Sequence, residues 1–193
     1  MQHLLARGYK VRGTVRTSAQ GDELLSTFPT GFDYTVVPDI AESNCFKGLA
    51  NDVEGILHVA SPFHFNFTNP RTELVEPAKE GVLNALKAGT ESSTLKRIVL
   101  TSSTAAVFIQ GTPPELFDAS KDWNTASPAN YYAHPDEPTE DKMDRYRASK
   151  AISERAAWDW FESNKEKLNW DLVSIVPGYV FVSQSIATSR AVR

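Results

Sequence analysis

The sequence predicts an α/β protein built on a doubly wound parallel sheet with helices on both faces. Strand-like segments alternate with helix-like segments along the 193 residues. Several strand-like segments are nearly continuous apolar runs, which is typical of strands buried on both faces of a sheet. The helix-like segments have the length of crossover connections, and right-handed crossovers between parallel strands generate a doubly wound sheet.

Composition narrows the classes of function. The chain is 41% hydrophobic and 23% charged, with a net charge of −4, which disfavours nucleic-acid binding. No apolar run approaches the roughly 20 residues that a membrane span requires. A single cysteine, Cys45, excludes an internal disulfide and favours a reducing compartment. The length predicts one domain over residues 1–193. The opening MQHLLARG is too short and mixed for a secretory signal, so we expect the cytoplasm.

Five segments are predicted as strands. They cover residues 9–16, 32–39, 53–61, 96–104 and 170–180. The first alternates and is rich in β-formers, the second ends at Pro38, and the last three are nearly continuous apolar runs. The order of the segments then predicts parallel pairing through helical crossovers.

Helices are predicted between these strands. In residues 71–92, Val75, Ala78, Val82 and Leu86 recur at spacings of three and four, as an amphipathic helix requires. A longer helix is predicted from about 140 to 165. The opening LLARG reads as the end of a helix, with Gly8 as its stop. Residues 111–138 hold five of the eleven prolines and are predicted as a surface loop over the carboxyl edge of the sheet.

Tyr146 and Lys150 are the first candidates for chemistry. At positions i and i+4 of the long helix their side chains point the same way. A phenol has a pKa near 10, and a nearby ammonium favours the phenolate and lowers that pKa. The alternative is an ordinary solvent-facing pair, because this spacing is common on exposed helix faces.

Context favours chemistry over that alternative. The stretch TSS, residues 101–103, follows an apolar strand at the carboxyl edge where open α/β sheets place their active sites. A serine hydroxyl there can bind a substrate carbonyl, although a plain strand cap explains the same residues. The turn VPGYV, residues 176–180, follows the last strand and is suited to packing on a cofactor ring.

With these motifs the chain resembles the extended short-chain dehydrogenase/reductase family, in the branch of plant dihydroflavonol reductases and fungal aldehyde and ketone reductases. The matching stretches include RGYKVRGTVR, HVASP, EPAKEGVLNAL, RIVLTSSTAAV, YRASKAISERAAW and PGYV. The resemblance implies a Rossmann-like fold and NADPH-dependent reduction of a small carbonyl compound. By it, Ser103 polarises the carbonyl, Tyr146 supplies the proton, and Lys150 lowers the tyrosine pKa and holds the nicotinamide ribose.

Cofactor selection is expected at Arg16. An acidic residue at the end of the second strand of such folds selects NAD, whereas an arginine suits the 2′-phosphate of NADP. NADPH is therefore favoured over NAD, although the stretch SAQGDE lacks the lysine that relatives often add. The resemblance places further residues at the cofactor: Asp39 and Ile40 by the adenine, Val59, Ala60 and Ser61 along the cleft, and Pro177 and Val180 at the nicotinamide.

The pattern departs from the family at the phosphate site. None of the ten glycines forms G-x-G or G-x-x-G, the turn that brings backbone and a helix N-terminus to a pyrophosphate. By the resemblance, about twenty residues are expected before Met1, including a central strand between segments 9–16 and 53–61. A smaller substrate lobe is likewise expected after the last residue.

Alternatives stay open. A sugar-nucleotide epimerase or dehydratase is a related reading, but dehydratases place acidic residues after the catalytic hydroxyl, where this chain has Thr104 and Ala105. A catalytically inactive remnant that acts only as a binding protein is another.

His58 is interpreted as a core histidine, with no metal site around it. Phe63, Phe65 and Phe67 form a pocket wall or pack under a loop. Substrate identity and oligomeric state are not predicted.

Overall fold

The computed structural model describes residues 1–109, 111, 117–137 and 139–180. Its strands are all parallel to their partners and confirm the five predicted segments with shorter bounds. They are β1 (Val11–Val15), β2 (Phe32–Val36), β3 (Gly55–His58), β4 (Arg97–Thr101) and β5 (Asp171–Ile175). The helices are α1 (Gln2–Ala6), α2 (Ser18–Thr27), α3 (Glu76–Gly89), α4 (Ala126–Ala133) and α5 (Lys142–Asn164), with short turns η1 (Arg71–Val75), η2 (Thr104–Ala106) and η3 (Lys165–Lys167).

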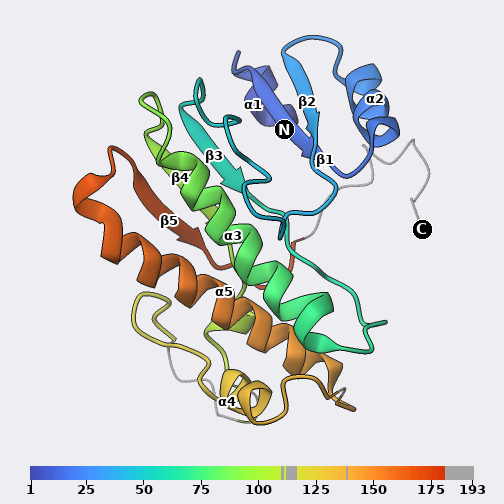
Figure 1. The fold of residues 1–193 in the computed structure, drawn as a ribbon, viewed down its shortest axis with the longest axis vertical. Coiled ribbons are helices and arrows are strands. Elements are labelled where there is room, and N and C mark those ends of the chain that lie inside the picture. Colours follow the sequence, from blue (N-terminus) through green and yellow to red (C-terminus); the bar gives the residue numbers. More distant parts are fainter. Residues whose placement is uncertain (110, 112–116, 138, 181–193) are drawn as a thin grey trace.

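The described strands form two sheets. One holds β1 and β2, and the other has the order β3-β4-β5 (Figure 1). Among these strands β1 and β3 do not pair with each other, and the break falls where the sequence places the expected central strand. The α/β architecture with parallel sheets is as predicted.

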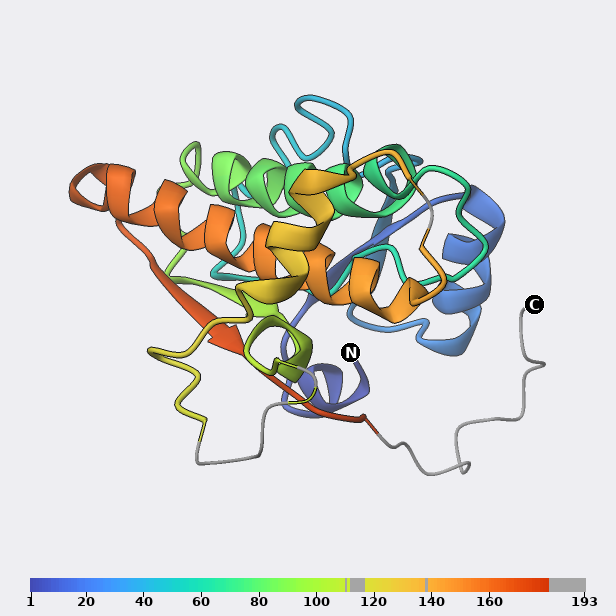
Figure 2. The ribbon, with the colours of Figure 1, turned by 90° about the horizontal axis from the view of Figure 1, so that it is seen from below.

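Helices α3 and α5 cover one face of the three-stranded sheet, and α1 lies on its other side (Figure 2). Leu86 of α3 and Ile98 of β4 are fully buried at the centre of this core. On the opposite face Leu57 is 55% and Ile175 53% exposed. The prediction of strands buried on both faces is therefore wrong for the described residues, because these helices cover only one face.

Two helices lie outside the sequence prediction. In α2 the Thr17 side chain accepts the N–H of Gln20, and Gly21 lies against the Tyr34 ring, where a Cβ would come within 2.2 Å of a ring carbon. Helix α4 lies inside the segment predicted as loop. Its Pro128 is in the first turn, where a missing N–H costs no helical hydrogen bond.

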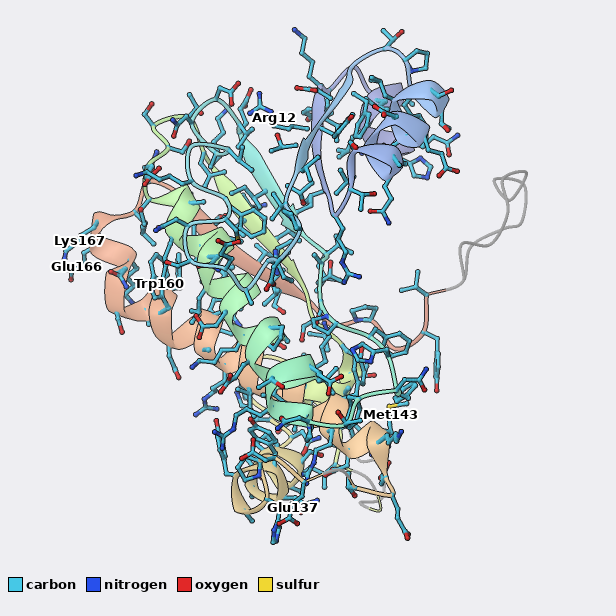
Figure 3. The ribbon with its side chains drawn as sticks, turned by 45° about the vertical axis from the view of Figure 1, so that its right-hand side comes forward. Arg12, Glu137, Met143, Trp160, Glu166 and Lys167 are labelled. Atoms are coloured by element: carbon cyan, nitrogen blue, oxygen red, sulfur yellow. The ribbon has the colours of Figure 1, made fainter. Side chains whose placement is uncertain are left out.

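The long helix α5 begins two residues later than predicted, at Lys142. Asp141 caps it, because the Asp141 carboxylate accepts the N–H of Asp144 at 3.2 Å. Figure 3 shows Met143 near this beginning of α5 and Trp160 toward its far end. Lys150 of α5 reaches the carboxyl end of β4, and toward the far end of the helix Trp160 stacks on Trp170 at the core.

Candidate active site

Ser103 lies two residues after the end of β4 and precedes the turn η2. Its backbone is extended, and its Oγ accepts the N–H of Ala105 at 3.2 Å, so the serine caps this turn. The side chain is buried, with 8% of the residue exposed. The strand-cap interpretation is thus correct, and it leaves the hydroxyl hydrogen free to donate elsewhere.

Tyr146 of α5 meets Ser103 from the helix side. The phenol is half-buried, and the Ser103 hydroxyl lies near enough to it to act on its pKa. Burial raises the pKa of Tyr146, and the interaction with Ser103 opposes that rise without cancelling it. A phenol in this state keeps its proton at neutral pH and can act as an acid.

Lys150 lies one turn further along α5, with 7% of the residue exposed. Its Nζ donates to the carbonyl oxygen of Thr101 at 3.1 Å, which ties the ammonium to the last residue of β4. Burial lowers the pKa of Lys150, and the carboxylate of Glu154 opposes that shift. The sequence predicts that Lys150 lowers the pKa of Tyr146, but the net shift at Tyr146 is upward because burial outweighs the interaction that lowers it.

Sequence reasoning missed the pair Ser102 and Glu154. Both are buried, with 5% and 3% of the residue exposed, and Ser102 Oγ donates a short hydrogen bond to Glu154 Oε2. The sequence does contain a pattern that could have predicted this pair, since Glu154 follows Lys150 by four residues and Ser102 is the first serine of TSS. A carboxylate one turn beyond a buried lysine on a helix is expected to share its face.

An aromatic side chain borders the phenol. The ring of Phe63 lies edge-on to Tyr146 with centroids 5.0 Å apart, and Phe63 is 65% exposed. Phe67 is instead buried, with only 3% of the residue exposed, and the ammonium of Lys142 lies 5.5 Å from its ring centroid. Of the two sequence interpretations, packing under a loop thus describes Phe67, while Phe63 lies open beside Tyr146.

The turn after β5 reaches the same place. The carbonyl oxygen of Pro177 accepts the N–H of Thr104 at 3.0 Å, which joins the turn to the residue after Ser103. Val180 follows and is 74% exposed. Pro177, one of the two residues expected at the nicotinamide, is therefore linked to the residue that follows Ser103.

The expected cleft residues follow β3. Val59 and Ala60 are exposed, and the Ser61 hydroxyl is buried without a hydrogen-bond partner among the described residues. His58, the last residue of β3, is buried, and burial together with the charge of Lys150 lowers its pKa to about 4. It is thus a neutral core histidine at neutral pH, as the sequence predicts.

Arg16, Asp39 and Ile40 belong to the other sheet. Arg16 is exposed just after β1, and the exposed Asp39 accepts the N–H of Ala41 at 2.8 Å. Ile40 packs against Gly81 of α3, where a Cβ would come within 2.7 Å of its side chain. These residues therefore follow the carboxyl ends of β1 and β2, separate from the cluster around Tyr146.

The described residues contain neither a membrane-spanning helix nor a metal-binding cluster. No helix among them combines the length and apolar character needed to cross a membrane. No three side chains of His, Cys, Asp or Glu gather there in a way that could hold a metal ion.

The fold is an α/β arrangement of parallel strands, and its structural neighbours are Rossmann-fold short-chain dehydrogenases/reductases. The chain is 37% identical to a ketoreductase of Aspergillus niger over 195 residues, covering 94% of this chain and 53% of the relative. It is 33% identical to the NADPH-dependent methylglyoxal reductase of Saccharomyces cerevisiae over 192 residues, covering 94% and 54%. No family model matches the chain.

Solved structures give the same result. The Gre2 protein of Candida albicans, crystallised with NADPH, matches with a TM-score of 0.86 and 34% identity, covering 98% of this chain and 56% of that one. The homologues of this chain are thus fungal NADPH-dependent aldehyde and ketone reductases of the extended short-chain dehydrogenase/reductase family, and the resemblance seen in the sequence is confirmed. The chain spans about half the length of these relatives.

Proposed function

We propose that this chain carries the catalytic residues of an NADPH-dependent reductase that converts an aldehyde or ketone into an alcohol. One observation carries the proposal. Ser103 and Tyr146 lie close together at the carboxyl end of β4, and Lys150 donates a hydrogen bond to the last residue of the same strand. Relatives that match 94% of this chain include an NADPH-dependent methylglyoxal reductase and a ketoreductase, which supports carbonyl reduction.

In this mechanism the substrate carbonyl oxygen lies between the two hydroxyl groups. Ser103 Oγ donates a hydrogen bond to that oxygen, and Tyr146 Oη gives it the proton. The raised pKa of Tyr146 keeps the phenol protonated until the oxygen becomes basic enough to take the proton. The Lys150 ammonium, held on the Thr101 carbonyl, stabilises the phenolate that remains.

NADPH, when bound, supplies the hydride that adds to the carbonyl carbon. The chain presents residues of suitable chemistry for both the nicotinamide end and the adenine end of this cofactor. Exposed apolar surface follows β3 and β5, the buried Ser61 hydroxyl lacks a described partner, and an exposed cation follows β1. The residues assigned to it are Arg16 for the 2′-phosphate, Asp39 and Ile40 for the adenine, Val59, Ala60 and Ser61 for the cleft, Lys150 for the ribose, and Pro177 and Val180 for the nicotinamide.

Phe63 is assigned to the substrate. It is largely exposed and touches the Tyr146 ring edge-on, so its free face borders the position of the carbonyl. An aromatic face there favours the alkyl part of a small aldehyde or ketone over a sugar nucleotide.

One observation favours the second candidate, a chain that retains these residues without turnover. The sequence has no glycine-rich turn for a pyrophosphate, and β1 and β3 do not pair with each other among the described strands. Such a chain binds NADPH weakly or not at all, because backbone N–H groups at a helix N-terminus provide much of the binding energy for the pyrophosphate.

A fluorescence titration of NADPH with the purified chain separates the two candidates. A version extended at its N-terminus with a strand and glycine turn is titrated in parallel, and both are then assayed with methylglyoxal. The proposal expects saturable NADPH binding and NADPH consumption by the chain itself. Binding and turnover by the extended version alone would assign this chain to the second candidate, and failure of both versions would contradict the reductase assignment.

A further inference from the structure

The buried carboxylate of Glu154 has no part in the mechanism above, although it lies one helical turn beyond Lys150. It is among the most deeply buried acidic groups described, with 3% of the residue exposed. A buried carboxylate is costly unless other groups compensate it. In this structure Ser102 donates a hydrogen bond to it, and the ammonium of Lys150 acts on it electrostatically.

The strand end holds the two charged side chains side by side. Lys150 Nζ donates to the carbonyl oxygen of Thr101, and Glu154 accepts from the hydroxyl of Ser102, the next residue. Two residues one turn apart in α5 are thus fastened to two consecutive residues at the carboxyl end of β4. The described residues show no Lys150–Glu154 ion pair within 4.0 Å, so the carboxylate acts on the ammonium through its charge and not through a direct contact.

We propose that Glu154 is a positioning residue, which, anchored by Ser102, keeps the Lys150 ammonium charged and directed at the end of β4 beside Tyr146. Without a compensating anion, a lysine this deeply buried tends to lose its proton. The neutral amine would no longer stabilise the phenolate of Tyr146. The inference rests on the proposed function for its meaning in catalysis, whereas the charge of Lys150 can be measured without turnover.

The groups around Lys150 are few. On α5 they are Glu154 and the phenol of Tyr146, and on β3 the imidazole of His58, whose pKa the lysine lowers. Strand β4 presents neutral groups, the Thr101 carbonyl and the Ser102 hydroxyl. Glu154 is therefore the group that offsets the burial of Lys150, and its charge can be removed at nearly constant shape by a Gln substitution.

The test follows the 13Cε chemical shift of Lys150 against pH in the 193-residue chain labelled with 13C-lysine, with the signal assigned by its loss in Lys150→Arg. Glu154→Gln keeps an oxygen for Ser102 but removes the charge. We expect the pKa of Lys150 to fall by about one unit, a roughly tenfold change in the ratio of ammonium to amine. Glu162→Gln, an exposed position on the same helix, is the matched control and leaves the titration unchanged.

A folded Glu154→Gln chain with the wild-type titration would overturn the proposal and leave Glu154 as a hydrogen-bonded link between α5 and β4. Glu154→Asp retains the charge and is expected to restore the titration in large part. If Glu154→Gln does not fold, Ser102→Ala carries the test, because it frees the carboxylate without removing it. An unchanged Lys150 titration in folded Ser102→Ala would then contradict the anchored role.

Turnover gives a second readout. With an active chain, the basic limb of the rate profile in Glu154→Gln moves to lower pH together with the Lys150 titration. If no turnover is seen while the titration still shifts, the proposed function fails and the electrostatic role of Glu154 stands. Failure of the proposed function and failure of the role of Glu154 therefore give different results.

Discussion

The two sheets of this chain differ sharply in how they are packed. In the three-stranded sheet, Leu86, Leu95 and Ile98 are buried to 1% exposure or less beneath α3 and α5. In the two-stranded sheet, α2 buries only Gly21 among its residues and β1 buries none fully. The residues proposed for proton transfer all lie on the first sheet and its helices, and Arg16 lies on the second.

The second sheet is tied to the first by few interactions. The guanidinium of Arg12 in β1 donates twice to the Asp52 carboxylate, at 2.8 and 3.0 Å, and Asp52 lies shortly before β3. Arg12 is labelled at this junction in Figure 3. Val37, after β2, packs with Ala85 and Ala88 of α3. The residues proposed for proton transfer thus lie on the buried core, whereas Arg16 follows a strand of the less buried sheet. The segment after β2 is held to α3 by Asn84, whose amide donates to the carbonyl oxygens of Ile40 and Glu42.

The largest expected effect is on the core of the first sheet. Leu86→Ala should lower the free energy of unfolding by about 2–5 kcal/mol, because it removes a fully buried side chain and leaves a cavity. Leu25→Ala on α2, where 39% of the residue is exposed, is the matched control and should cost less than about 1 kcal/mol. Urea unfolding measures both. Equal losses would mean that the two regions are packed alike.

The next effect is a pH dependence that originates at His58. Its pKa is about 4 in the folded chain against 6.5 in the unfolded chain, so between these values the unfolded chain binds the extra proton. Stability should be complete above about pH 6.5 and fall by as much as about 3 kcal/mol as the pH drops to 4. Urea unfolding at several pH values measures it.

His58→Asn removes this group and should flatten that part of the pH profile. His64→Asn, which removes an exposed imidazole, is the control and should retain the fall. If the free energy of unfolding of His58→Asn fell with pH as much as that of the wild type, other groups would cause the loss of stability in acid. Burial of His58 in the first sheet would then not be its cause.

A smaller effect is expected on cofactor selection by the second sheet. Arg16→Ala should weaken NADPH binding about tenfold, or about 1.4 kcal/mol, with little change for NADH, because the guanidinium is assigned to the 2′-phosphate. Fluorescence titrations with both nucleotides give the ratio, and Arg7→Ala, at the end of α1, is the control. An equal loss for both nucleotides would remove Arg16 from the 2′-phosphate site.

The smallest effect concerns the link between the sheets. Asp52→Asn weakens the exposed pair with Arg12, so amide hydrogens of β1 and β2 should exchange faster while those of β4 keep their protection. Hydrogen exchange followed by mass spectrometry measures both regions in one sample. Glu54→Gln, which breaks the exposed pair with Lys96, is the matched control. Faster exchange throughout the chain would show that the two regions unfold as one unit.

The same contrast explains what the sequence could predict. Apolar runs and regular spacings identified β4, α3 and α5, because burial on a core imposes a clear pattern. The positions of Ser103 and Tyr146 followed from their places on these elements. Helix α2 was missed because it buries so little, and its apolar residues form no strong stripe.

Electrostatic details were less predictable from sequence. The upward pKa shift of Tyr146 comes from burial by segments distant in sequence, among them the loop that carries Phe63. The anchoring of Glu154 by Ser102 likewise joins residues 52 positions apart. Spacing along one helix could suggest a lysine near a tyrosine, but the balance of burial against charge needed the assembled core.

The central claim is that Tyr146 is the proton donor of a carbonyl reductase. The most direct measurement compares NADPH consumption with methylglyoxal in the wild-type chain, in Tyr146→Phe, and in Tyr132→Phe, whose tyrosine is 65% exposed on α4. The account predicts a loss of at least about 100-fold in Tyr146→Phe, with NADPH binding retained, and a wild-type rate in Tyr132→Phe. A Tyr146→Phe chain that reduces methylglyoxal at the wild-type rate would contradict it.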